Sequence, residues 1–205
     1  MKDKLVLLVG PSGVGKTTIA KALEKEGFNI IHSYTTRKPR GENEWGHTFV
    51  HESDYKFIPQ EDGNIYIAKI GEKSVRGNII SSVDAIAYLY LYGNHYWATK
   101  EQYKNKGTSV YVVCPGGARE VQENVTDAEV LTIFFTCDEA VRKERLIFRY
   151  SQEGKETGWD ITDVLLTANE RIEKDREAFK VCSCDYTIDV NRPIKEVLSL
   201  IKNII

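Results

Sequence analysis

The feature that most constrains this chain is an uninterrupted phosphate loop close to its beginning. Residues 10–17 read Gly-Pro-Ser-Gly-Val-Gly-Lys-Thr and satisfy the spacing G-x-x-x-x-G-K-[ST]. The loop follows the apolar run Leu5–Val9 and precedes a helix-like segment, 17–26. This order predicts a buried strand, a glycine-rich turn and a helix, which is the context that a nucleotide-binding loop needs.

The loop carries the chemistry for binding a nucleoside triphosphate. Backbone N–H groups between the glycines can surround phosphate oxygens, and the N-terminus of the following helix adds partial positive charge. Lys16 can reach the β- and γ-phosphates, and the Thr17 hydroxyl can ligate a metal ion. A glycine-rich turn without a ligand is the alternative, and the four constrained positions of the motif, together with its context, argue against it. The predicted nucleotide-contacting residues are Gly10, Ser12, Gly13, Val14, Gly15, Lys16, Thr17 and Thr18.

Composition narrows the class of protein. A chain of 205 residues with 41% hydrophobic and 28% charged residues suits one globular domain. A net charge of −2 gives no basic excess for a nucleic-acid or membrane partner. The first strand begins directly after Lys4, and no apolar run is long enough to span a bilayer, so we expect a cytoplasmic location. The four cysteines lack the spacing of a zinc site, and we expect reduced thiols.

Predicted strands and helices alternate along most of the chain, which favours a parallel sheet flanked by helices on both faces. We expect strands at 5–9, 28–32, 109–114, 130–135 and 186–190, and helices at 17–26, 99–106, 117–123, 138–150, 163–180 and 193–204. The polar, glycine-bearing segment 151–160 predicts a mobile loop. The β-prone run Tyr88–Tyr92 and the turn at Gly93 predict a hairpin.

A second motif lies in residues 33–42, which read Ser-Tyr-Thr-Thr-Arg-Lys-Pro-Arg-Gly-Glu and are followed by Gly46 and Phe49. Arg37 and Arg40, three residues apart in a loop, are suited to hold a phosphate dianion. A solvated basic loop is the alternative for these arginines alone. Their place after a phosphate loop favours phosphate binding.

Together with the run 93–96 and the later arginines, these motifs make the chain resemble the guanylate kinase family over nearly its whole length. The resemblance implies an α/β, three-layer P-loop NTPase fold with a central parallel sheet, an inserted acceptor-binding lobe and a small lid. It implies one domain, 1–205, with its core in 1–32, 99–147 and 164–205, its lobe in 33–98 and its lid in 148–163. It also implies Mg²⁺-dependent phosphoryl transfer from ATP to a small nucleotide, GMP or dGMP, with Thr17 as the metal ligand.

On the acceptor side, the resemblance implies that Arg37 and Arg40 hold the acceptor's phosphate together with Tyr96. Glu42 would orient Arg40 or contact the sugar, and Ser33 would face a base oxygen. His47 stands near the place of a tyrosine that family members usually carry, and its ring could still donate to phosphate.

On the donor side, the resemblance implies that Arg149 and Arg171 close over the transferring phosphoryl group beside Lys16, with Arg145 in support. The alternative is that these helical arginines pair with Glu144, Glu170 or Asp175 on the surface.

The chain departs from the family pattern where guanine would be read. Two acids that serve this purpose in the family align with Ala87 and Cys114, and Asp84 or Glu120 could substitute for them. About twenty residues, 58–79, look inserted into the lobe. Two alternatives therefore stay open: a kinase of a sugar phosphate such as ribose 1,5-bisphosphate, and a catalytically weak guanylate-kinase-like binding module.

Overall fold

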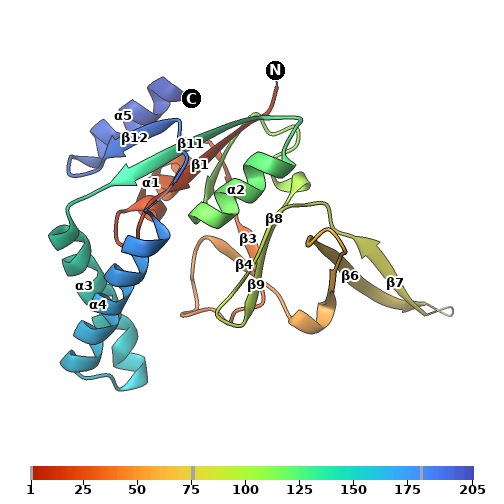
Figure 1. Ribbon diagram of the computed structural model, residues 1–205, viewed down its shortest axis with the longest axis horizontal. Coiled ribbons are helices and arrows are strands. Elements are labelled where there is room, and N and C mark those ends of the chain that lie inside the picture. The colour runs from red at the N-terminus through yellow and green to blue at the C-terminus, as the bar shows by residue number, and fades with distance from the viewer. Residues whose placement is uncertain (1, 75–76, 181) are drawn as a thin grey trace.

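The computed structural model describes residues 2–74, 77–180 and 182–205, and its centre is a five-stranded parallel sheet (Figure 1). The strand order is β12-β11-β1-β10-β2. Leu5 of the central strand lies between Ser109 and Val130 of its two neighbours. The strands are β1 (Lys4–Val9), β2 (Asn29–Ile31), β10 (Thr108–Val112), β11 (Glu129–Thr136) and β12 (Tyr186–Asp189). The predicted parallel sheet is confirmed.

Helices cover both faces of this sheet, because the side chains of β1 alternate between two apolar layers. Leu7 faces a cluster that contains Val121 of α2, and Leu8 faces a cluster that contains Leu23 of α1 and Ile201 of α5. The helices are α1 (Lys16–Lys25), α2 (Pro115–Asn124), α3 (Glu139–Thr157), α4 (Ile161–Ala178) and α5 (Ile194–Ile204). The predicted three-layer α/β fold is confirmed. No helix of the described residues is long and apolar enough to cross a membrane.

A lobe of β-structure projects from the core between β2 and β10 (Figure 1). Its first sheet has the order β4-β3-β9-β8, with β3 (Ser33–Thr35), β4 (His47–Phe49), β8 (Ala85–Leu91) and β9 (Asn94–Thr99). The predicted hairpin joins β8 to β9, and Tyr92 and Gly93 at its turn have φ values of 51° and 75°. Short 3-10 helices lie at Glu52–Asp54 and Lys100–Gln102, so the predicted helix at 99–106 is limited to one turn.

A second sheet of the lobe is antiparallel and consists of β5 (Tyr55–Pro59), β6 (Ile65–Ser74) and β7 (Gly77–Ser82). It packs on the first sheet through aromatic rings: Phe57 stacks on His95 with 3.6 Å between ring centroids and meets Trp97 edge-on. The predicted insertion at 58–79 therefore belongs to a sheet that already begins at Tyr55. Residues 75 and 76 of that insertion lie outside the described residues.

The predicted mobile loop at 151–160 is wrong, because α3 continues to Thr157 and α4 begins at Ile161. Gly154, which suggested a loop, lies inside α3 where an added Cβ would come within 3.0 Å of Trp159. Close packing of Trp159 thus explains a glycine at this helical position. The proposed lid, 148–163, is the far end of a helical hairpin rather than a loop.

Candidate active site

The phosphate loop turns sharply from β1 into α1 at positions that require glycine. Gly13 has a φ of 78°, and an added Cβ would lie 2.9 Å from the carbonyl oxygen of Arg142. Gly15, the residue before α1, has a φ of 109°. Residues with a Cβ atom rarely adopt this left-handed backbone conformation. The glycines at these two positions therefore allow the chain to make the turn.

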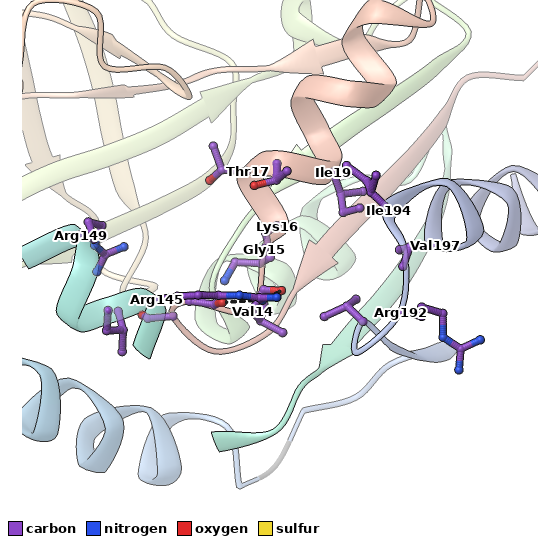
Figure 2. Close-up of a pocket in the computed structure, with 15 residues that line it drawn as sticks. Val14, Gly15, Lys16, Thr17, Ile19, Arg145, Arg149, Arg192, Ile194 and Val197 are labelled. Atoms are coloured by element: carbon purple, nitrogen blue, oxygen red, sulfur yellow. Dashed lines mark hydrogen bonds between the residues drawn. The ribbon is translucent and has the colours of Figure 1, made fainter. Parts of the chain in front are cut away.

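A cavity of about 590 Å³ opens in front of the loop (Figure 2). Residues 12–18 form one wall, which includes every predicted nucleotide-contacting residue except Gly10. Arg145 and Arg149 of α3 form a second wall, while Arg192 and Ile194 lie at the opposite end (Figure 2). Backbone amides and cations at one end, and apolar side chains such as Ile194 beside Arg192 at the other, suit a nucleotide whose phosphates lie on the loop.

Lys16 lies folded under the loop, and its Nζ donates hydrogen bonds to the carbonyl oxygens of Gly10 (2.5 Å) and Pro11 (3.1 Å). Burial is the main cause that lowers the pKa of Lys16, Asp175 opposes it, and the neighbouring arginines add to the lowering, so that the pKa falls to about 8. The buried ammonium group of Lys16 is therefore poorly solvated, and an anion bound in the cavity would stabilise its charged form.

A buried ion pair behind the loop was not foreseen. The Asp175 carboxylate, 2% exposed, accepts from the Ser12 backbone N–H at 2.6 Å and from Arg142 Nη2 at 3.0 Å. Arg142 also donates from Nε to the Ser12 carbonyl oxygen at 3.0 Å. Asp175 was considered only as a surface partner. A signal was present, because it shares the helical spacing of the buried Ala168 and Ile172.

Two of the three arginines assigned to the donor side line the cavity, and the third contacts the phosphate loop from behind. Arg145 Nη1 donates to the Gly13 carbonyl oxygen at 3.1 Å. Arg149 lines the cavity and lies 3.8 Å from Glu153 of its own helix. Arg171 lies behind the loop, where its Nε donates to Ser12 Oγ at 2.6 Å and is 3.2 Å from Asp175.

The acceptor loop between β3 and β4 is organised by Glu44. Arg37 donates two hydrogen bonds to this carboxylate, at 3.1 and 2.7 Å, and the Arg40 backbone N–H donates a third at 2.7 Å. Burial raises the pKa of Glu44, but these donors outweigh burial, so its pKa is lowered. Glu44 therefore holds Arg37 and the backbone of Arg40, because a turn at Gly41 returns the chain toward Arg37, and the role of Glu42 stays a prediction.

Ser33, His47 and Tyr96 lie together beside this loop. Ser33 and His47 are opposite one another in the β3–β4 pair, and Ser33 Oγ is 2.8 Å from His47 Nδ1. The His47 ring centroid is 5.8 Å from that of Tyr96, and Tyr96 lies near enough to Arg37 to act on its charge. The structure therefore gathers four of the predicted acceptor residues, but the Ser33 hydroxyl is engaged by His47 rather than open to a base.

A groove of about 480 Å³ connects the two halves of the site. Thr17 and Lys21 of α1 line it on one side, and residues 40–45 of the acceptor loop line it on the other. Arg149 and Glu153 of α3 complete the lining. Phosphates bound at the loop and at the acceptor arginines would face each other across this groove.

The positions of the missing acids remain apolar or weakly polar. Ala87 is 4% exposed and packs in the core with Ala98 and Val113. Cys114 directly precedes α2 as its N-cap residue. Glu120, a suggested substitute, lines a separate cavity of about 470 Å³ at the edge of β8, together with Ala87.

Comparison with known proteins gives one consistent result. The family described as "AAA domain" matches residues 6–176. A guanylate kinase of Enterococcus faecalis (strain ATCC 700802 / V583) is 31% identical over 211 residues, covering 98% of this chain and 87% of the relative. One of Myxococcus xanthus (strain DK1622) is 27% identical, covering 98% and 85%. The crystal structure of guanylate kinase from Anaplasma phagocytophilum has the same fold, with a TM-score of 0.59 at 19% identity, covering 99% and 84%.

Proposed function

Because this chain belongs to the guanylate kinase family, we propose that it transfers the γ-phosphoryl group of ATP to a nucleoside monophosphate, GMP or dGMP. The observation that carries this proposal is the groove lined jointly by Thr17, Arg40 and Arg149. A binding module needs no such path between two phosphate sites, whereas direct transfer requires the two phosphates to meet. ATP and nucleoside monophosphates are cytoplasmic metabolites, and we place the reaction there.

On the donor side, Lys16 and the amides of the loop would hold the β- and γ-phosphates. Arg145 and Arg149, from the cavity wall, would neutralise charge on the transferring group, and Arg171 would hold Ser12 and support them. Among the described residues, no group of three His, Cys, Asp or Glu side chains could hold a metal ion. Mg²⁺ would therefore rest on Thr17, the phosphates and water, and would supply further charge neutralisation.

On the acceptor side, Arg37, Arg40 and Tyr96 would hold the acceptor's phosphate, with His47 beside them. The attacking phosphate oxygen is already an anion, so the reaction needs no general base. The protein contributes position and charge, and movement of the α3–α4 hairpin over the groove would exclude water that could hydrolyse ATP.

A coupled assay of ADP release with GMP, dGMP, AMP, CMP and UMP tests this function. We expect turnover with GMP and dGMP, and loss of turnover in Lys16→Met. A folded sample that binds ATP and turns over none of the five acceptors would contradict the proposal. Activity in wild type that Lys16→Met abolishes would exclude the catalytically weak binding module.

A sugar phosphate such as ribose 1,5-bisphosphate is a second candidate acceptor, favoured by the methyl side chain of Ala87 where the family carries an acid. Guanine's N1–H and amino group are donors that need acceptors, and a methyl group offers none. Thermal shift with GMP and with ribose 1,5-bisphosphate separates the candidates, because a ligand stabilises the protein that binds it. Stabilisation by GMP alone would exclude the sugar phosphate.

A further inference from the structure

Lys21 is a cation of the groove that the transfer reaction described above does not use. It lines the groove together with Thr17 of its own helix and Arg40 of the acceptor loop. Lys21 follows Thr17 by four residues in α1, so the two side chains lie on the same face of the helix, one turn apart. The face of α1 that borders the groove therefore carries a hydroxyl group and, one turn later, an ammonium group.

Trp45 holds the acceptor loop against this part of α1. Its indole Nε1 donates a hydrogen bond to Glu24 Oε2 at 3.0 Å, and its ring meets that of His32 edge-on, with 4.9 Å between the centroids. Lys21 Nζ lies over the same indole ring, 5.6 Å from its centroid. The ammonium group of Lys21 is thus directed toward the acceptor loop, although the side chain as a whole is exposed.

The acids around the groove do not neutralise Lys21. Three acids line the groove, and two of them are paired with arginines: Glu44 with Arg37, and Glu153 with Arg149. Within the residues that the structure describes, no ion pair involves Lys21. Its contact with the indole ring is a cation–π interaction, which is weak at an exposed site. A phosphate dianion that enters the groove would therefore attract the ammonium group more strongly than the ring does.

The remaining charges of the groove favour an anion. Across the described part of the chain, no ion pair involves the third acid, Glu42, or the guanidinium group of Arg40. Lys21 and Arg40 together carry two positive charges against the single negative charge of Glu42. The groove between the two phosphate sites therefore has an excess of positive charge, with one cation on α1 and one on the acceptor loop.

We propose that Lys21 binds the acceptor's phosphate from the side of α1, opposite Arg40, and holds it toward the γ-phosphate of ATP. This inference rests on the proposed function for its ligand. Transfer brings two anions together, and a cation where they meet offsets their repulsion. Lysine suits this position, because its ammonium group is a point charge on a flexible stem and can leave the indole ring to follow the phosphate.

Calorimetric titration with GMP in the absence of ATP tests this contact without turnover. Lys21→Met removes the charge and keeps most of the stem, so we expect the Kd of GMP to rise about tenfold while the Kd of ATP stays unchanged. Lys21→Arg should restore most of the binding, and Lys21→Glu should weaken it more than Lys21→Met does. An unchanged Kd of GMP in Lys21→Met, or equal losses for GMP and ATP, would overturn the proposal.

Lys25→Met is the matched control, because Lys25 lies one further turn along α1 and is also exposed. We expect no measurable change in the Kd of GMP for this variant, and unchanged urea midpoints for both variants. Similar losses of GMP binding in Lys21→Met and Lys25→Met would indicate a general effect of surface charge and would overturn the proposal. A lowered urea midpoint in Lys21→Met alone would make Lys21 a support of the loop and would overturn it too.

Steady-state kinetics extend the test to the reaction. We expect Lys21→Met to raise the KM of GMP about tenfold, with a smaller fall in kcat and no change in the KM of ATP. Absence of turnover with every acceptor in wild type would defeat the proposed function. Turnover in wild type together with an unchanged KM of GMP in Lys21→Met would defeat this inference alone.

Discussion

The two halves of the site hold their cations in different ways. On the donor side, Lys16 and Arg145 are hydrogen-bonded to backbone carbonyl oxygens of the loop itself. On the acceptor side, Arg37 is paired with the carboxylate of Glu44. An incoming phosphate competes with peptide dipoles at Lys16 and Arg145, and with a full negative charge at Arg37. These two donor-side cations are therefore ready for a ligand, whereas Arg37 must exchange one anion for another.

The two halves also differ in how deeply the residues that hold each loop are buried. The donor loop is backed by the ion pair of Arg142 and Asp175, with side chains 8% and 3% exposed. The acceptor loop belongs to the lobe of β-structure, and its residues Lys38 and Arg40 are exposed to solvent. We expect substitutions behind the donor loop to affect folding, and substitutions in the acceptor loop to affect substrate binding.

The largest effect is expected on the donor side, for Lys16→Met. Removal of the ammonium group leaves the β- and γ-phosphates without their central cation, and we expect kcat to fall by about 10³-fold. Steady-state kinetics with GMP measure the loss, and circular dichroism shows whether the fold is kept. A folded variant with less than tenfold loss would mean that Lys16 does not contact the transferring phosphate.

The support of the donor loop is tested by Asp175→Asn. The change leaves Arg142 buried without its counter-charge, and we expect about 3 kcal/mol less free energy of unfolding in urea. Glu170→Gln is the matched control, since this acid pairs with Lys174 on the exposed surface of the same helix. We expect no measurable change in the control. A similar loss of unfolding free energy in both variants would show that the buried pair stabilises the protein no more than the exposed pair does.

The acceptor side is tested by Arg37→Ala. Loss of its planar, two-pronged donor should lower kcat/KM for the acceptor by about 10²-fold and leave the KM of ATP unchanged. Lys38→Ala removes the same charge from the next, exposed position, and should change kcat/KM little. A general electrostatic role of the loop would instead give the two variants similar losses.

The smallest effect concerns pH. Because the pKa of Lys16 is lowered to about 8, the free protein loses this charge as the pH rises through 8, and ATP binding should weaken. We expect the Kd of ATP to increase about tenfold between pH 7 and pH 9. Calorimetric titration measures it, and Lys16→Arg, which stays charged, should show a flat profile in this range. A flat wild-type profile would place the pKa of Lys16 above 9.

Local patterns predicted most of the fold. The apolar run at 5–9, the glycines of the loop and the turn at Gly93 describe structures whose hydrogen bonds are made between near neighbours, so a short window of sequence contains the information. The prediction failed at Gly154, where a polar segment with a glycine looked like a loop. The deciding contact there is Trp159, and its packing is not visible in the composition of the segment.

In the candidate site, the sequence predicted residues whose type is specific for phosphate binding. It did not predict residues whose partners lie far away in the sequence. Arg37 and Arg40 were assigned to a phosphate from their type and spacing, and the later arginines from the family resemblance. The structure brings Arg145 and Arg149 to the cavity and Arg40 to the groove. Glu44 was missed because Glu42 is nearer to the motif, and only the path of the loop shows which acid turns back to Arg37. Asp175 entered only in the alternative, as a surface partner of the arginines, because its buried partners Ser12 and Arg142 are distant in the sequence.

By itself, the sequence determined that this chain has a strand–loop–helix for phosphates, a loop with Arg37 and Arg40 and a parallel α/β core. These follow from backbone conformations and periodicities that act over a few residues. Only the tertiary structure decided which groups hold them in place: Arg142 reaches Ser12 across 130 positions of sequence, and Asp175 reaches the same residue across 163. Such bonds depend on how the elements pack against one another. A buried polar group needs a hydrogen-bond partner, and only the packed fold determines which distant residue provides it.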